Sequence, residues 1–184
     1  MENPIIKILT ARRATRSISR ESLPDNMIVE LMEAIRLTPS CYNKQPWHFL
    51  FLQSQEGLAK GHQILSPGNH PWASRAPLLV IGYAKKKDDC MLPDGRAYYQ
   101  FDVGMSVMNL MLSATHLGLV ARPMAGWDPA KVKELFKLEP DDEPIIVLAI
   151  GFPSDDESHL ADYYKCADKK PRVRKEISEI IIRL

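Results

Sequence analysis

The chain has 184 residues, of which 45% are apolar and 26% are charged, and its formal net charge at pH 7 is +1. This length suffices for one domain with its own core, and the near-neutral charge argues against a surface that binds nucleic acid. No apolar run approaches the roughly 20 residues that span a bilayer, so we expect one domain over residues 1–184 and no membrane association.

The N-terminal segment and the cysteines predict where the protein resides. No long apolar segment with a small-residue cleavage site is present, so no signal peptide is expected. Cys41, Cys90 and Cys166 are odd in number and widely spaced, which favours a reducing compartment. Histidines and cysteines lack partners at metal-ligand spacing, so we predict a cytoplasmic protein without a metal site, in which Cys41 is a packing thiol.

Helix and strand signals alternate along the chain. Asn3 followed by Pro4 predicts a helix over residues 5–13. A second helix is predicted over residues 25–37, where four apolar residues fall on one buried face: Ile28, Leu31, Met32 and Ile35. Short apolar runs bounded by proline predict strands over residues 47–53, 76–83 and 144–153. The pattern indicates a single α/β or α+β unit.

A long central helix is predicted over residues 94–119, with Gly118 just past its C-terminus. Its middle is apolar almost all the way round, as in a helix buried on every side or at an oligomer interface. Asp102, Asn109 and His116 recur every seven residues on this helix. They are interpreted as hydrogen-bonded polar groups at a packed surface, with a catalytic role as the alternative.

Two basic clusters lie at opposite ends of the chain. Arg12, Arg13 and Arg16 follow the first predicted helix, and Arg12 and Arg16 share a face if that helix continues. The second cluster lies around Pro171 and consists of Lys169, Lys170, Arg172 and Arg174. Each cluster alone is typical of a solvated surface, whereas together they could converge on one dianion such as a phosphate monoester. Sequence spacing leaves this open.

Six segments in this order resemble the FMN-dependent nitroreductase family: RRATR at 12–16, PSCYNKQPW at 39–47, the helix from Asp102 to Leu119, PMAG at 123–126, IGFP at 150–153 and KPR at 170–172. The resemblance implies an α+β fold, a three-layer α/β/α sandwich with a mainly antiparallel sheet. It also implies a homodimer with the central helix at its interface and FMN bound between the chains. The C-terminal tail, residues 161–184, would wrap the partner subunit.

The resemblance also assigns the FMN contacts residue by residue. The phosphate would be bound by Arg12, Lys170 and Arg172, with Lys169 or Arg174 as alternatives to Lys170, and Arg13 and Ala14 would also belong to the FMN site. Arg16 would lie near the ribityl chain and the N1 edge of the ring. The ring would contact Pro39, Ser40, Cys41 and Asn43, and N5 would face the backbone of Met124, Ala125 and Gly126. Relatives often have serine at position 14, so Ala14 removes a hydroxyl. No side chain is assigned as a catalytic acid or base.

The implied function is a two-electron oxidoreductase that works by a ping-pong scheme. NAD(P)H would reduce the flavin at N5, and a nitroaromatic, quinone or similar small electrophile would then be reduced on the same face. Other FMN chemistry of the family, dehalogenation or flavin fragmentation, is one alternative, and a non-catalytic FMN-binding protein is another. Trp72 is a candidate for a substrate-facing lid, whereas Gln45 and Trp47 are expected to be structural.

Overall fold

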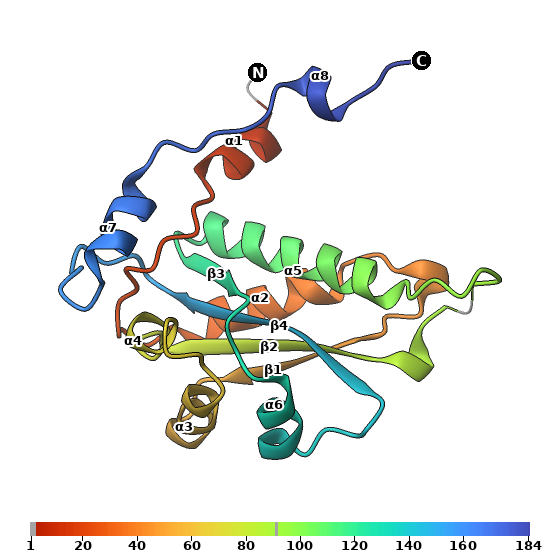
Figure 1. Ribbon diagram of the computed structural model, residues 1–184, viewed down its shortest axis with the longest axis horizontal. Helices are drawn as coiled ribbons and strands as arrows, with labels where there is room; N and C mark the ends of the chain where they lie inside the picture. Colours follow the sequence, from red (N-terminus) through yellow and green to blue (C-terminus); the bar gives the residue numbers. More distant parts are fainter. Residues whose placement is uncertain (1–2, 91) are drawn as a thin grey trace.

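The computed structural model describes residues 3–90 and 92–184, and within them a four-stranded antiparallel sheet forms the centre of the molecule (Figure 1). The strand order is β1-β2-β4-β3, and the strands are β1 (Trp47–Leu52), β2 (Leu78–Lys85), β3 (Val120–Met124) and β4 (Asp142–Gly151). The three predicted strands are confirmed. β3 escaped prediction because it is short and contains an arginine and a proline, which weaken the strand signal.

Helices cover both faces of the sheet (Figure 1). One face packs against α2 (Asp25–Arg36) and α5 (Tyr99–His116), and the other against α3 (Gln55–Gln63), α4 (His70–Ala73) and α6 (Pro129–Phe136). Successive residues of β2 alternate between the two cores: Leu78 and Val80 join the first, and Leu79 and Ile81 join the second. The fold is therefore the expected α+β three-layer sandwich.

Helix α1 (Pro4–Ala11) begins as predicted but ends two residues early. The Asn3 side chain accepts a hydrogen bond of 3.0 Å from the Ile5 N–H, which confirms the predicted N-cap. Arg12 leaves the helix with extended backbone (φ −56°, ψ 123°). The helix does not continue, so the condition under which Arg12 and Arg16 would share a helix face is not met. No residue of α1 that the structure describes is buried, so packing does not prolong the helix.

Helix α2 buries Ile28, Leu31 and Ile35, but Met32 is 43% exposed, so the predicted buried face is one residue too wide. Helix α5 begins at Tyr99 and not at residue 94. The backbone before it is held in a non-helical form, because the Tyr98 N–H donates a hydrogen bond of 2.9 Å to the Asp89 carboxylate. Gly118 has φ +76°, which confirms it as the residue past the helix end.

One side of α5 is packed in the core, and the other side is open within a single chain. Val103 and Leu110 are fully buried, whereas Phe101 is 56% exposed and Met108 is half-buried. Complete burial of this helix thus requires a second surface. On the polar stripe, Asp102 accepts from the Cys41 N–H and Asn109 donates to the Thr38 hydroxyl at 2.8 Å, as predicted for hydrogen-bonded groups. His116 is exposed.

Two tryptophans lie in the core. Trp47 is 9% exposed at the start of β1, which confirms its predicted structural role. Trp72 in α4 is 1% exposed and packs in the second core, so the lid hypothesis is wrong: proline and glycine around it suggested an exposed loop, but α4 turns the ring inward. Gln45 holds its loop, as expected, by donating to the Asn43 side-chain oxygen at 3.1 Å.

The C-terminal segment leaves the sandwich after α7 (Asp162–Lys169) and passes α1 to reach α8 (Ile177–Ile180) (Figure 1). Both chain ends lie on the same side of the molecule, outside the layers (Figure 1). The tail carries exposed apolar side chains, among them Ile177 at 74% and Ile182 at 83%. Short 3₁₀ turns occupy Cys41–Asn43 and Lys86–Asp88. Among the helices described, none has the length and hydropathy of a membrane span.

Candidate functional site

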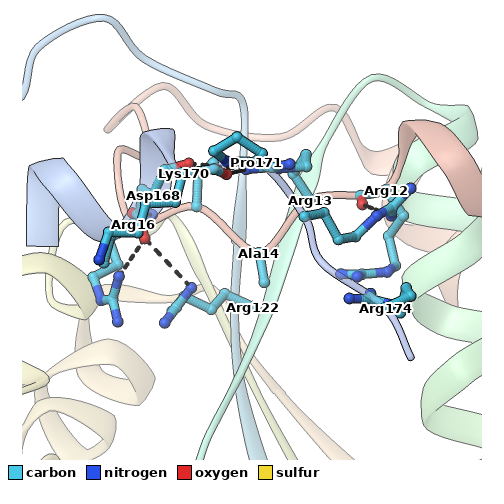
Figure 2. A pocket seen from close by; sticks show the side chains of 12 residues that line it. Arg12, Arg13, Ala14, Arg16, Arg122, Asp168, Lys170, Pro171 and Arg174 are labelled. Carbon is cyan, nitrogen blue, oxygen red and sulfur yellow. Dashed lines mark hydrogen bonds and ion pairs between the residues drawn. The ribbon is translucent and has the colours of Figure 1, made fainter. Parts of the chain in front are cut away.

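The two basic clusters converge on one pocket of about 320 Å³ (Figure 2), which we call the basic pocket. The segment after α1, the middle of β3, the last turn of α7 and the segment after α7 all contribute to its wall. Its lining residues are Arg12, Arg13, Ala14, Thr15, Arg16, Arg122, Ala167, Asp168, Lys170, Pro171, Arg172 and Arg174. The convergence that sequence spacing left open is thus present in the fold.

Two arginines hold the converging segments together. Arg172 donates hydrogen bonds of 2.9 to 3.1 Å to the backbone carbonyl oxygens at the end of α1, those of Leu9, Thr10 and Arg12. In the opposite direction, Arg13 donates to the carbonyl oxygens of Asp168 and Lys170 at 3.1 and 2.9 Å. These guanidiniums replace water at carbonyls that no helix satisfies, so Arg13 and Arg172 build the wall of the pocket.

Three other cations of the pocket keep their charge free. Within the described residues, the side chains of Arg12 and Lys170 make no hydrogen bond or ion pair, and Arg174 donates to the neighbouring Val173 carbonyl. Partial burial lowers the pKa of Arg12, and the charges of Arg172, Arg174 and Arg13 lower it further. The charges that contribute to this shift are all positive, so a bound anion would oppose them. We call the region of Arg12 and Arg174 the Arg12 end; Lys170 lies on the Asp168 side of Ala14 (Figure 2).

At the other side of the pocket, Arg16 is paired. Its guanidinium and its backbone N–H both donate to the Asp168 carboxylate, the latter at 2.7 Å, and Tyr164 covers the guanidinium with its ring centroid 4.2 Å away. Arg122 Nη1 lies 4.0 Å from the same carboxylate. Burial lowers the pKa of Arg122, the Arg16 charge adds to this, and Asp168 opposes it. We call this region the Arg16 end.

Sequence reasoning missed Arg122, Asp168 and Tyr164. A charged residue inside a short strand directly before P-M-A-G was the available signal for Arg122. Asp168 and Tyr164 gave none, because acidic and aromatic residues on an exposed helix are ordinary, and their role depends on where α7 docks.

The P-M-A-G turn follows Arg122 at the end of β3 and is fixed from behind. The Gly126 carbonyl accepts hydrogen bonds from the Ser66 N–H at 3.1 Å and from the Asn69 amide at 2.9 Å. A Cβ at position 126 would lie 2.5 Å from the Ser66 hydroxyl oxygen and 2.9 Å from the Asn69 amide nitrogen, so a larger residue would displace these side chains. Met124 is buried, whereas Ala125 is exposed. The hydrogen bonds to the Gly126 carbonyl hold the turn in place next to Ala125.

A second hollow, of about 640 Å³, adjoins the basic pocket and shares Arg12, Ala14, Arg172 and Arg174 with it. Its remaining lining is mostly apolar: Ile6, Leu9, Thr10, Met108, Met111 and Pro123. An anion-binding end that opens onto an apolar surface suits a ligand with a charged group on a flat or extended apolar body.

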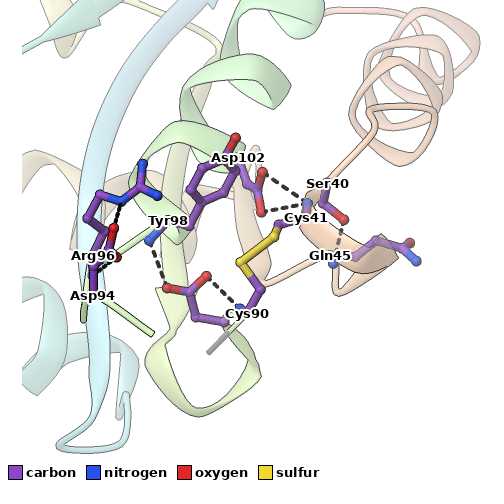
Figure 3. Close-up of a disulfide and its surroundings, with 9 residues drawn as sticks. Ser40, Cys41, Gln45, Cys90, Asp94, Arg96, Tyr98 and Asp102 are labelled. Atoms are coloured by element: carbon purple, nitrogen blue, oxygen red, sulfur yellow. Dashed lines mark hydrogen bonds and ion pairs between the residues drawn. A yellow bond between two sulfur atoms is a disulfide. The ribbon is translucent and has the colours of Figure 1, made fainter. Parts of the chain in front are cut away.

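The loop with Pro39, Ser40, Cys41 and Asn43 lies elsewhere, at the N-terminal end of α5 (Figure 3). The Cys41 N–H lies 3.3 Å from both Asp102 carboxylate oxygens. From Asp102 to Met111, which lines the apolar hollow, the helix rises about 14 Å. A single chain therefore keeps this loop apart from the basic pocket, although the resemblance assigns both to one site.

The same loop has an unusual backbone. Tyr42, Asn43 and Gln45 have φ values of 48°, 55° and 48°, in the left-handed region that most residues avoid. The Ser40 hydroxyl accepts a hydrogen bond of 2.8 Å from the Gln45 N–H and holds the loop in this form. Strained backbone of this kind persists only where its surroundings enforce it, and it is concentrated at functional sites.

Cys41 forms a disulfide with Cys90, with the two Cα atoms 6.0 Å apart (Figure 3). The prediction of a packing thiol at Cys41 is wrong, and the disulfide also removes the cysteine-based argument for a reducing compartment. Because 49 residues separate the two cysteines, their pairing depends on how α5 and the segment after β2 pack, which spacing alone does not reveal. Cys166 is free and exposed.

Asp102 supports the loop with a buried carboxylate, and a pH-dependent stability follows. Burial raises the pKa of Asp102; the hydrogen bond from Cys41 opposes the shift and the Asp89 charge adds to it. The folded state therefore binds this proton more tightly than the unfolded state, whose aspartate pKa is about 3.9. As the pH rises above about 4, Asp102 ionises more readily in the unfolded state than in the folded state, so the free energy of unfolding falls. A neutral side chain at this position would not cause this fall.

Asp102→Asn retains an acceptor for the Cys41 N–H and removes the buried charge. Relative to wild type, the variant should gain thermal stability as the pH rises from 4 to 8, which melting curves at several pH values would measure. Asp162→Asn, at a side chain that is 94% exposed, provides the control. A difference in Tm that stays constant or shrinks over this range would contradict the argument.

Comparisons with known proteins place the chain in a family. A family model described as the nitroreductase family matches residues 9–66 and 58–152. A protein of Stenotrophomonas maltophilia with the provisional name NADH dehydrogenase/NAD(P)H nitroreductase is 30% identical over 147 residues, which cover 71% of this chain and 75% of that protein.

Solved structures share the fold at lower identity. One described as an oxidoreductase containing FMN has a TM-score of 0.85 at 22% identity and covers 99% of this chain and 91% of its own. A provisionally named nitroreductase of Exiguobacterium sibiricum, solved in complex with FMN, has a TM-score of 0.80 at 20% identity and covers 100% and 99%. At these identities, the likeness is one of fold.

Proposed function

This chain belongs to the nitroreductase family, and from that premise we propose that it is an FMN-dependent oxidoreductase that transfers a hydride from NAD(P)H to a small electrophile. Nitroaromatics and quinones are the proposed acceptors. The names of the Stenotrophomonas relative and of the Exiguobacterium complex support the donor and the cofactor. The observation that carries the proposal is the crowded positive charge at the Arg12 end, directly beside an apolar hollow.

The residues present fit FMN. A phosphate monoester is a dianion, and the two cations of the Arg12 end, Arg12 and Arg174, match it in charge, with Lys170 in the same pocket. Ala14 has no hydroxyl group, so backbone N–H groups would donate the hydrogen bond to the phosphate that a serine hydroxyl would otherwise donate. Met108, Met111 and Pro123 provide apolar contacts for a flat ring. When bound, FMN supplies the capacity to accept and donate a hydride at its N5 atom.

The protein's own part is binding and orientation. In the proposed arrangement Arg16 lies near the ribityl chain and the N1 edge, and the backbone N–H groups of Met124, Ala125 and Gly126 face N5. The fixed Gly126 carbonyl keeps this turn rigid. No side chain acts as a general acid or base, and the donor and the acceptor would use one open face in turn.

We propose that a homodimer completes the site. In one chain the loop over residues 39–43 lies along α5, far from the basic pocket, so the same loop of a partner subunit would have to supply the contacts to the ring. The exposed apolar side chains of α1, α5 and the tail would be covered in such a dimer, including Ile5 at 61% and Phe101 at 56%. The tail over residues 161–184 would wrap the partner. The cytoplasm is the proposed location because NAD(P)H is available there.

An absorbance spectrum of the purified protein tests the function. We expect oxidised-flavin bands that NADH or NADPH bleaches without oxygen and that a nitroaromatic or quinone restores. A colourless protein that takes up no added FMN would contradict the proposal. A protein that binds FMN but is not reduced by either nucleotide would instead be a non-catalytic FMN-binding protein.

A further inference from the structure

The basic pocket has two places that can attract a phosphate. Its lining contains six arginines and one lysine, against the single carboxylate of Asp168. Arg13 and Arg172 are occupied by backbone carbonyls, which leaves the Arg12 end and the Arg16 end on opposite sides of Ala14 (Figure 2). A pocket with two cationic ends does not by itself fix the direction in which a phosphorylated ligand lies.

Asp168 distinguishes the two ends. Its carboxylate has a side chain only 9% exposed and accepts hydrogen bonds from both the backbone N–H and the guanidinium of Arg16. The carboxylate therefore occupies the position at which an external anion would contact Arg16. Arg122, with Nη1 4.0 Å away, shares the same negative charge. At the Arg12 end no carboxylate is among the lining residues described.

We propose that Asp168 is a specificity-determining residue that directs the phosphate of the ligand to the Arg12 end and so sets a single orientation of FMN. A dianion beside the Arg16 end meets a fixed like charge, whereas at the Arg12 end it meets Arg12 and Arg174, two cations that no carboxylate among the described residues balances. The orientation of FMN rests on the proposed function; the preference of a phosphate group for one end does not.

Arg16 acquires a second property from this pairing. Because Asp168 balances its charge, Arg16 stabilises added negative charge on a neighbouring ligand less than an unpaired arginine would. Loss of the carboxylate should therefore raise the midpoint potential of bound flavin. A residue that only anchored α7 would leave this potential unchanged.

The experiment uses Asp168→Asn in the full-length protein, with Asp162→Asn as the control for net charge on the same helix, where the side chain is 94% exposed. Inorganic phosphate, titrated calorimetrically into the flavin-free protein, is the first probe. Wild type and control should bind one phosphate per chain at the Arg12 end. Asp168→Asn should bind a second at the Arg16 end, with affinity there increased about tenfold.

The FMN-loaded proteins provide the second readout. Asp168→Asn should show a higher flavin midpoint potential than both wild type and Asp162→Asn. Unchanged phosphate stoichiometry and affinity in a folded Asp168→Asn protein would overturn the proposal, as would an unchanged potential in a variant that binds FMN normally.

A double variant, Arg12→Gln with Arg174→Gln, tests the same idea without touching Asp168. With the carboxylate in place, phosphate binding should be lost and should not move to the Arg16 end. Stoichiometric binding that persists in this variant would refute the directing role. If the wild type binds phosphate as described but never binds FMN, the proposed function fails while the preference between the two ends stands.

Discussion

Replacing Arg12 by glutamine is expected to weaken FMN binding about 100-fold while riboflavin binding stays within about twofold. The guanidinium is free of partners among the described residues and lies among the cations of the Arg12 end. Hydrogen bonds to charged groups contribute about 1.5–3 kcal/mol, and about 1.4 kcal/mol is a tenfold change in affinity, so about 100-fold lies near the upper end of this range. Riboflavin has no phosphate, so its affinity should not change when the Arg12 guanidinium is removed.

The ligand-free protein should respond in the opposite sense. Partial burial lowers the pKa of Arg12 and the neighbouring arginines lower it further, so its charge is disfavoured when no anion is bound. Arg12→Gln should therefore melt no lower than wild type in the absence of FMN. This separates loss of binding from loss of folding.

Flavin fluorescence titrations with FMN and with riboflavin measure the effect. The matched control is Arg36→Gln, at an exposed arginine of α2 that pairs with Glu33 and lies outside the basic pocket. Equal weakening of both ligands would show that Arg12 contacts another part of the flavin or acts through the fold.

Loss of the disulfide between Cys41 and Cys90 should produce the largest change in stability. It closes a loop of 49 residues, for which the chain-entropy model gives about 4 kcal/mol of unfolding free energy. It also ties the strained loop of residues 41–45 to the segment after β2. Replacing both cysteines by serine should therefore lower the urea midpoint and also weaken FMN binding in the proposed dimer, where this loop contacts the ring.

Urea denaturation of the oxidised protein, the reduced protein and the double serine variant measures the change. Trapping thiols in the unfolded, oxidised protein should find one free thiol, that of Cys166, and three after reduction. Cys166→Ser, at an exposed position, serves as the control and should unfold like wild type. A midpoint unaffected by reduction, with three free thiols throughout, would contradict the assignment.

Local sequence signals predicted local structure well. Asn3 caps α1, Gly118 ends α5 with positive φ, and the apolar runs around β1, β2 and β4 form strands. Capping, left-handed turns and strand burial depend on a few adjacent residues, so the sequence carries enough information. Even so, the lid interpretation of Trp72 was wrong, because the flanking proline and glycine residues do not say which side of a short helix is packed.

The candidate site divides in the same way. The two arginine clusters and the ordered motifs indicated the family and most of the candidate site residues, because residue types and their order can be read directly from the sequence. Arg122 and Asp168 were not predicted, and neither was the pairing of Cys41 with Cys90.

By itself, the sequence determined the residue types that can bind a phosphorylated flavin and the secondary structure that positions them. Only the tertiary structure decided which cations are free. Arg13 and Arg172 are occupied by carbonyls, and Arg16 by a carboxylate, of segments more than 150 residues away along the chain. Hydrogen bonding and charge balance at such distances depend on how the segments dock, and no spacing pattern encodes that docking.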